Sequence, residues 1–216
     1  MNKRYATVIS AYAPVQEISD EQRKALRQNF KPLAARRLTS LPLLIGELTK
    51  NTAPEPADEW LFASEFGGAV SLDKYLGSFP NPSPLHFQNS IHPGPLDLIN
   101  VIRRLPARQL TPMIGGENLL GNALLAALIS PADTVHLVIG EEYSAWASEQ
   151  SLGSDFTFGA YLKLSQKAEH AMAELVHEPE GNAPTVSTQE TAELLAHQKP
   201  LTTGLPSGGA IRLQWR

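Results

Sequence analysis

One stretch, GENLLGNALLAAL at residues 116–128, constrains the fold most, because it has the length of a helix and is apolar on nearly every side. An amphipathic helix can rest on a surface, but a helix that is apolar all round must be covered on every side. We therefore expect it to be a buried central helix, covered either by a second layer of this chain or by another chain. The longest apolar runs, LLGNALLAALI among them, stop short of the roughly 20 residues that a membrane span needs, so we expect no span.

Around this helix, strand-like and helix-like segments alternate along the chain. Short apolar runs rich in β-branched and aromatic residues predict strands, and apolar residues at three- and four-residue spacing predict helices. The predicted strands are YATVISAYA (5–13), WLFASEF (60–66), RQLTPMIGG, TVHLVIGEE (134–142), FGAYLKLSQ (158–166) and GGAIRLQWR, the last as an edge strand. The pattern predicts one α/β domain over residues 1–216, with a mixed, mostly parallel sheet flanked by helices.

Composition removes several functions from consideration. The chain has no cysteine, which excludes disulfides, a thiolate nucleophile and thiolate metal sites. Its six histidines include no pair at a spacing suited to zinc, and we expect neither a metal nor a cofactor. The net charge of −4 gives nucleic-acid binding no general basis. The N-terminal stretch lacks the pattern of a signal peptide, so we expect a cytoplasmic protein.

A local basic segment departs from the acidic balance of the chain. Residues 22–37 contain six Lys and Arg residues and no acid, and Arg23, Lys24 and Arg27 fall within its predicted helix. Charge runs on helices usually form a solvated face. The alternative is a docking surface for an acidic partner.

The segment HFQNSIHPGP at residues 86–95 places Ser90 two positions before His92, which raises the question of a catalytic pair. Triads work because the fold brings together residues that are distant in sequence, and a G-x-S-x-G nucleophile elbow is absent from the chain. We therefore expect Ser90 to cap a helix start rather than to act as a nucleophile. Further along, Gly115, Gly116 and Glu117 open a helix after a strand, so their amide groups could bind an anion.

Residues 60–145 resemble a known family. The segment LFASEFGG…SPLHFQNSIHPGPLDL…LTPMIGGENLLGNALLAAL…ADTVHLVIGEE is similar to the N-terminal half of β-ketoacyl synthases, which have the thiolase fold. It resembles most closely the short chain-length-factor subunits of aryl polyene and type II polyketide systems. Their F-x-x-S-V-H-N-A-x-A-G run is matched here at Phe87, Ser90, Ile91 and His92, while Pro93–Pro95 depart from it. The resemblance implies half of a thiolase-like fold.

The resemblance also implies that this chain does not catalyse condensation by itself. The nucleophilic cysteine of the family corresponds to a position between Met113 and Gly116, that is Met113, Ile114, Gly115 or Gly116, and none of these is a thiol. The family's catalytic His and Lys residues belong to a C-terminal half that has no counterpart here. Condensation needs a thiolate to carry the acyl group and His groups to promote decarboxylation.

By the resemblance, this chain is expected to be a non-catalytic subunit that pairs with an active β-ketoacyl synthase and shapes its acyl or polyene tunnel. Phe66 corresponds to a residue that gates chain length, although core packing would explain it equally well. Leu85 and Phe87 correspond to the dimer contact and the tunnel wall, and residues 89–92 (Asn89, Ser90, Ile91 and His92) to the partner interface. An acyl carrier protein is expected as a transient partner, with Arg23, Lys24 and Arg27 as its docking residues. The alternatives are a stand-alone acyl transferase or hydrolase that uses Ser90 and His92, or a homodimeric scaffold.

Overall fold

A single eight-stranded sheet forms the centre of the protein. The computed structural model describes residues 3–216, and its strands run in the order β3-β2-β4-β5-β1-β6-β8-β7. The strands are β1 (Lys3–Val15), β2 (Glu59–Ala63), β3 (Gln109–Met113), β4 (Thr134–Glu141), β5 (Thr157–Ser165), β6 (Ala173–Glu178), β7 (Leu201–Gly204) and β8 (Ala210–Trp215).

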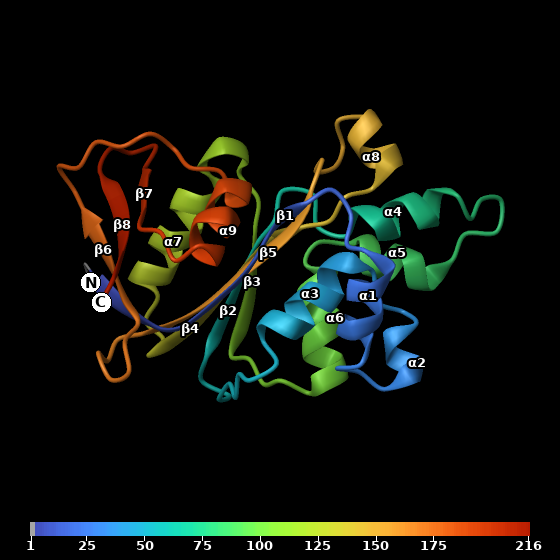
Figure 1. Ribbon diagram of the computed structural model, residues 1–216, viewed down its shortest axis with the longest axis horizontal. Coiled ribbons are helices and arrows are strands. Elements are labelled where there is room, and N and C mark those ends of the chain that lie inside the picture. Colours follow the sequence, from blue (N-terminus) through green and yellow to red (C-terminus); the bar gives the residue numbers. More distant parts are fainter. Residues whose placement is uncertain (1–2) are drawn as a thin grey trace.

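Helices cover both faces of this sheet (Figure 1). They are α1 (Asp20–Arg27), α2 (Pro32–Ala35), α3 (Ser40–Leu48), α4 (Ala69–Leu76), α5 (Pro84–Ser90), α6 (Gly94–Arg103), α7 (Leu119–Ile129), α8 (Ala145–Glu149) and α9 (Thr188–Ala196), with a 3₁₀ turn η1 (Gly116–Asn118) before α7. Ser19 begins α1 with a capping box, in which its side chain accepts from the Gln22 amide and the Gln22 side chain accepts in return.

The central strands are buried on both faces, and alternate residues enter two separate cores. In β2, Leu61 and Ala63 face the core that contains α7 and α9, while Trp60 and Phe62 face the core that contains α3 and α6. The same alternation in β4 and β5 follows from the two-residue period of a strand. Burial on both faces explains why these segments have near-continuous apolar runs in the sequence.

The predicted buried helix is α7, and this chain itself covers most of it. The sheet curls so that α7 contacts β2 and β4 at one end of the strand order and β6, β7 and β8 at the other. Figure 1 shows α7 and α9 between the central strands and the β6–β8 segment. The fit is close, since a Cβ added to Gly121 would lie 2.9 Å from the Gly204 carbonyl oxygen. The cover is incomplete, because Ile129 at the end of α7 is exposed.

Three expectations about the fold were wrong in detail. The sheet is mixed but mostly antiparallel, since only the β2–β3 and β2–β4 pairs are parallel. The closing strand β8 is not at the edge, because the unpredicted β7 pairs with it on the outside. Ser90 does not cap a helix start, because it is the last residue of α5, and α6 begins at Gly94 without a side-chain cap.

Candidate functional site

Three chain segments meet where β2, β3 and β4 end. Both β3 and β4 pair in parallel with β2, so the carboxyl ends of all three strands lie at the same end of the sheet. The segments are residues 64–68 after β2, 114–116 after β3 and 142–144 after β4. The Ser64 amide donates to the Met113 carbonyl over 3.2 Å, which joins the first two. The carboxyl ends of these strands bring together Phe66, His92 and the residues from Met113 to Gly116. These residues are separated by up to 50 positions in the sequence.

The segment after β2 is held by Glu141, the last residue of β4. One carboxyl oxygen of Glu141 accepts from Ser64 Oγ over 3.0 Å and from the Phe66 amide over 3.2 Å, and the other accepts from the Glu65 amide. Ser64 Oγ in turn accepts from the Gly67 amide over 2.8 Å. Burial raises the pKa of Glu141 to about 8, against these hydrogen bonds, which lower it.

The amide groups of Gly115 and Gly116, which the sequence suggested for anion binding, already hold a carboxylate of this chain. Glu65 Oε2 accepts from the Gly116 amide over 2.7 Å and from the Gly115 amide over 3.2 Å. These amides can bind an anion, as predicted, but the anion is the side chain of Glu65. Met113 is half-buried, and Ile114, Gly115 and Gly116 are exposed. None of the four side chains carries a nucleophilic group.

His92 supports the segment after β2 from the other side. Its Nε2 lies 2.9 Å from the Ser64 carbonyl oxygen and donates to it, and its ring packs on Phe62 with centroids 5.0 Å apart. Burial lowers the pKa of His92, against the bond to Ser64 and the charge of Glu65. Ser90 Oγ instead donates to the Phe87 carbonyl over 2.8 Å. Within residues 3–216 no hydrogen bond joins Ser90 to His92, so the geometry of a nucleophile and its base is missing.

The close contact between residues 67–68 and the end of α5 requires glycine. Gly67 has a φ of +60°, and a Cβ added to Gly68 would lie 2.4 Å from the Asn89 carbonyl oxygen. The double glycine is therefore in direct contact with Asn89, Ser90 and His92. Phe66 immediately precedes this glycine pair in the chain.

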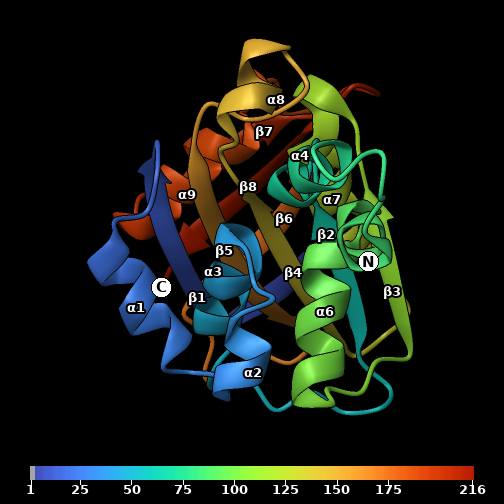
Figure 2. The ribbon, with the colours of Figure 1, turned by 90° about the vertical axis from the view of Figure 1, so that its right-hand side faces the viewer.

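An apolar surface adjoins this site on α4 and α5. Figure 2 looks onto the end of the molecule that carries α4 and α6, with β3 at the sheet edge. Phe87 and Ile91 are 50% and 49% exposed, and Tyr75 packs between Phe79 and Phe87 with ring centroids 5.5 and 5.3 Å away. The exposed apolar residues of this region, which we call the α4–α5 surface, are Leu76, Phe79, Leu85, Phe87 and Ile91. Clusters of exposed apolar residues mark interaction sites more often than isolated ones do.

The carboxylates Glu141 and Glu142 are functional candidates that the sequence reasoning missed. Glu142 is fully buried and accepts from the amides of Leu41 and Val70, each over 3.0 Å, so it joins the first turns of α3 and α4. Burial raises the pKa of Glu142. The sequence feature that could have identified both carboxylates is the pair of adjacent acids at the end of the apolar strand TVHLVIGEE. Acids at such a place need partners, but the sequence does not show that these are backbone amides of distant loops.

The three basic residues suggested for docking lie on α1, and the structure divides them. Lys24 and Arg27 line a hollow of about 430 Å³ together with Arg36 and the Phe30 ring. Arg23 lines a different hollow beside α4, and its guanidinium donates to Ser40 Oγ over 3.2 Å. Within residues 3–216 none of these cations forms an ion pair with an acid.

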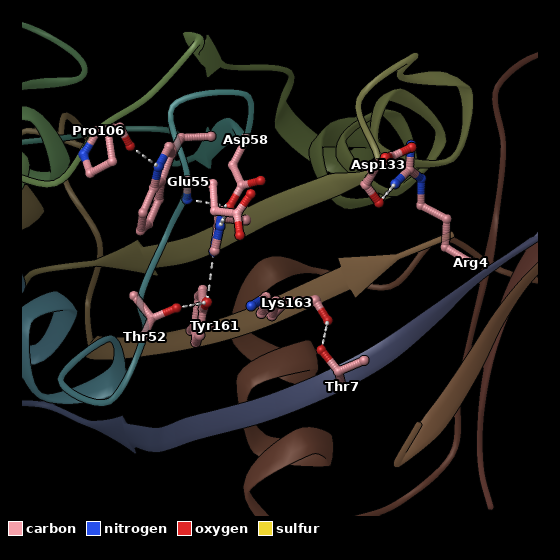
Figure 3. Close-up of polar contacts among 11 residues, drawn as sticks. Arg4, Thr7, Thr52, Glu55, Asp58, Pro106, Asp133, Tyr161 and Lys163 are labelled. Atoms are coloured by element: carbon pink, nitrogen blue, oxygen red, sulfur yellow. Dashed lines mark hydrogen bonds and ion pairs between the residues drawn. The ribbon is translucent and has the colours of Figure 1, made fainter. Parts of the chain in front are cut away.

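A second polar cluster is buried at the other end of the sheet (Figure 3). His136 lies 2.9 Å from Asp58 Oδ2 through Nε2 and 2.8 Å from the Tyr161 hydroxyl through Nδ1, and that hydroxyl lies 2.7 Å from Thr52 Oγ1. His136 and Tyr161 are fully buried. Burial lowers the pKa of His136 and raises that of Tyr161. A substrate cannot reach these two side chains, and a raised phenol pKa opposes nucleophilic use, so the cluster stabilises the core.

Two further features concern the described residues. Between Lys3 and Arg216, no group of three or more Asp, Glu or His side chains is arranged to hold a metal ion. No helix in that range has both the length and the apolar character to cross a bilayer.

Similarity to known proteins is found in structure only. No protein-family model matches the chain, and no curated protein matches it in sequence. A chain of a ketosynthase in complex with its chain length factor, from Xenorhabdus doucetiae, matches with a TM-score of 0.62 and 17% identity, over 98% of this chain and 99% of that one. A chain of the ishigamide ketosynthase/chain length factor matches with a TM-score of 0.65 and 9% identity, over 100% and 99%.

A β-ketoacyl synthase from Burkholderia phymatum matches with a TM-score of 0.55 and 13% identity, over 92% of this chain and 70% of that one. The chain therefore has the mixed α/β, thiolase-like fold of the ketosynthases and chain-length factors, as the resemblance in sequence predicted.

Proposed function

We propose that this chain is a non-catalytic, chain-length-factor-like subunit that pairs with an active β-ketoacyl synthase. In that pair it seals one side of the partner's acyl or polyene tunnel and limits how far the product extends. The observation that carries the proposal is the structural match from end to end with chains from two ketosynthase/chain-length-factor complexes. At 9–17% identity this similarity concerns the fold, so the pairing itself needs a direct experiment.

The chemistry of the strand ends supports a non-catalytic role. The segment that corresponds to the family's nucleophile contains Met113, Ile114, Gly115 and Gly116, and the chain has no cysteine. The amides of Gly115 and Gly116 are occupied by Glu65, so they do not stabilise an acyl oxyanion in this conformation. The partner must then supply the thiolate and the groups that promote decarboxylation.

The α4–α5 surface is the proposed contact with the synthase. Its exposed side chains include Leu85, Phe87 and Ile91, and it lies beside Phe66 through the contact of the double glycine with Asn89. Aromatic and aliphatic side chains of this kind dominate the binding energy at the centre of interfaces. A permanent heterodimer of this type should bury more than roughly 2,000 Å² in total.

A carrier protein is the proposed source of substrate. Carrier proteins are acidic in general, and the hollow lined by Lys24, Arg27 and Arg36 offers three cations without an acid in its lining. Arg23, which was included in the docking surface from the sequence, faces a separate hollow that also contains Asp73. We therefore assign the transient contact to Lys24, Arg27 and Arg36 and leave Arg23 out.

Co-expression with a cysteine-containing β-ketoacyl synthase and its carrier protein tests the pairing. We expect a one-to-one complex in size-exclusion chromatography, with condensing activity in the complex and none in the isolated chain. Turnover of acyl thioesters by the isolated chain that Ser90→Ala abolishes would instead support a transferase or hydrolase. Self-association without synthase binding would support a homodimeric scaffold. Either result contradicts the proposal.

Replacing Phe66 by Ala tests the role in product length. Phe66 is 37% exposed at the end of a segment fixed by backbone hydrogen bonds, so its truncation should leave the fold intact. We expect the complex to make longer products, or a broader range of lengths, as measured by mass spectrometry. Phe156→Ala is the matched control, because Phe156 is 36% exposed but lies just before β5, outside the α4–α5 surface. An unchanged distribution from an intact Phe66→Ala complex would remove Phe66 from the mechanism.

A further inference from the structure

We infer that Glu141 is a positioning residue, whose buried carboxyl group holds the segment that carries Phe66 and thereby sets the depth of the partner's tunnel. This inference rests on the proposed function, because the depth of a tunnel has meaning only in the complex with a synthase. The hydrogen bonds of Glu141 are properties of the isolated chain, and they can be tested there separately.

The hydrogen bonds of the segment that follows β2 converge on one side chain, that of Glu141. Glu141 receives three hydrogen bonds from consecutive residues, namely from Ser64 Oγ and from the amides of Glu65 and Phe66. These three residues directly follow β2, where the chain turns toward α4. The side chain of Phe66 is partly exposed and so has limited packing to fix its own position. The position of Phe66 is then determined mainly by its backbone, and Glu141 is a direct partner of that backbone.

Glu141 is well placed for this role because its own position is rigid. It ends β4, which pairs with β2 on one side and with β5 on the other, and its side chain is almost completely buried. Groups that support a functional conformation act best when they are built on regular elements and locked by packing.

The effect extends from Phe66 to the neighbouring segment. The Glu65 amide donates to Glu141, while the Glu65 carboxylate accepts from the amides of Gly115 and Gly116. The two carboxylates therefore link the ends of β4, β2 and β3 in series. Loss of Glu141 should loosen residues 64–66 first and residues 115–116 second.

Glu142 provides a matched control because it is the adjacent buried carboxylate with a different target. It accepts from Leu41 and Val70 and makes no hydrogen bond to residues 64–66 within the described part of the chain. Glu142→Leu should therefore disturb the packing of α3 and α4 without releasing the Phe66 segment directly.

Two substitutions at position 141 separate hydrogen bonding from shape. Glu141→Leu keeps a similar volume but removes every acceptor, which leaves two backbone amides without a partner. Glu141→Gln keeps one acceptor oxygen in place of two, so it can accept either from the Glu65 amide or from the Phe66 amide, but its NH2 group cannot accept from the other. The Gln variant should therefore rescue only part of what the Leu variant loses.

Amide hydrogen exchange on the isolated chain tests the first step. We expect exchange at Glu65 and Phe66 to be roughly tenfold faster or more in Glu141→Leu than in wild type, and to be restored at only one of these two amides in Glu141→Gln. In Glu142→Leu the faster exchange should instead appear at Leu41 and Val70. Unchanged exchange at Phe66 in a folded Glu141→Leu chain would overturn the inference.

Product length in the complex tests the second step. Glu141→Leu should shift the products in the same direction as Phe66→Ala, Glu141→Gln should shift them less, and Glu142→Leu should keep the wild-type lengths. A merely structural role would lower complex yield in both Leu variants and leave product length alone, and this outcome overturns the inference. If Phe66→Ala itself has no effect in an intact complex, the proposed gate is what fails, and the exchange experiment still decides whether Glu141 holds the segment.

Discussion

The buried cluster around His136 allows a prediction in which two similar substitutions have different effects on stability. The Tyr161 hydroxyl lies 2.7 Å from Thr52 Oγ1 (Figure 3). It also lies 2.8 Å from His136 Nδ1. His136 Nε2 faces the Asp58 carboxylate over 2.9 Å and therefore carries the proton that it donates. Nδ1 must then be an acceptor, so Tyr161 donates to it and accepts from Thr52. Each group in the cluster has one defined role.

Tyr161→Phe removes the donor and leaves His136 Nδ1 as an unpaired acceptor at a fully buried position. A buried polar group without a partner costs about 1–3 kcal/mol, whereas Thr52 is only half-buried and can turn to water. We expect the free energy of unfolding to fall by about 2 kcal/mol, which corresponds to a decrease of about 1 M in the urea midpoint. The fluorescence of Trp60, whose ring stacks on His136 at 4.4 Å, reports on this region directly.

Tyr12→Phe is the matched control. The Tyr12 hydroxyl is buried and has no hydrogen-bond partner within the described chain, and Tyr12 packs against the same core as Tyr161. Its removal should leave stability unchanged or raise it slightly, because an unsatisfied group is lost. Equal losses in the two variants, or a Tyr161→Phe protein as stable as wild type, would refute the assigned hydrogen-bond roles.

Two further predictions concern the interface and the buried carboxylate. Ile91→Asp should weaken binding of the synthase at least about tenfold in a titration, because it places a charge on the α4–α5 surface, whereas Val101→Asp on α6, a similarly exposed apolar position, should have little effect. Because burial raises the pKa of Glu141 from 4.5 to about 8, the folded state binds this proton more tightly than the unfolded state, so stability should increase as pH falls from about 8 toward 4.5. Protonation of Glu141 contributes at most about 5 kcal/mol to the free energy of unfolding. The plot of this free energy against pH between 6.5 and 8.5 should therefore be flatter for Glu141→Gln than for wild type.

The elements that the sequence predicted well are those whose burial is visible in composition. The run at 116–128 could only be a covered helix, and β2, β4 and β5 have apolar residues at consecutive positions because both faces enter a core. The missed strand β6 reads AELVHE, with polar residues mixed into its apolar pattern. The other missed strand, β7, has only four residues. Such short or polar segments become strands through pairing with β8, which no local pattern reveals.

The direction of the strands was mispredicted for a related reason. Alternation of helices and strands favours parallel pairing through crossovers, and β2, β3 and β4 follow that rule. The first strand, however, inserts between β5 and β6 and runs antiparallel to both. Its place in the sheet depends on pairings between residues more than 140 positions apart, such as Tyr5 with Ser165. Spacing within the sequence contains no information about such pairings.

In the candidate site, too, the sequence indicates the types of side chain but not the geometry of the chain that holds them. Phe66, His92 and the 113–116 segment were singled out through a family resemblance, and the structure brings them close together, but the groups that hold them were not predicted. Glu141 and Glu65 act on backbone amides, which every residue possesses, so their partners leave no trace in the sequence. The two carboxylates fix the chain at the ends of these strands through hydrogen bonds to its own backbone. A fixed backbone at this position is what the proposed function requires of a subunit that contributes shape to its partner's tunnel.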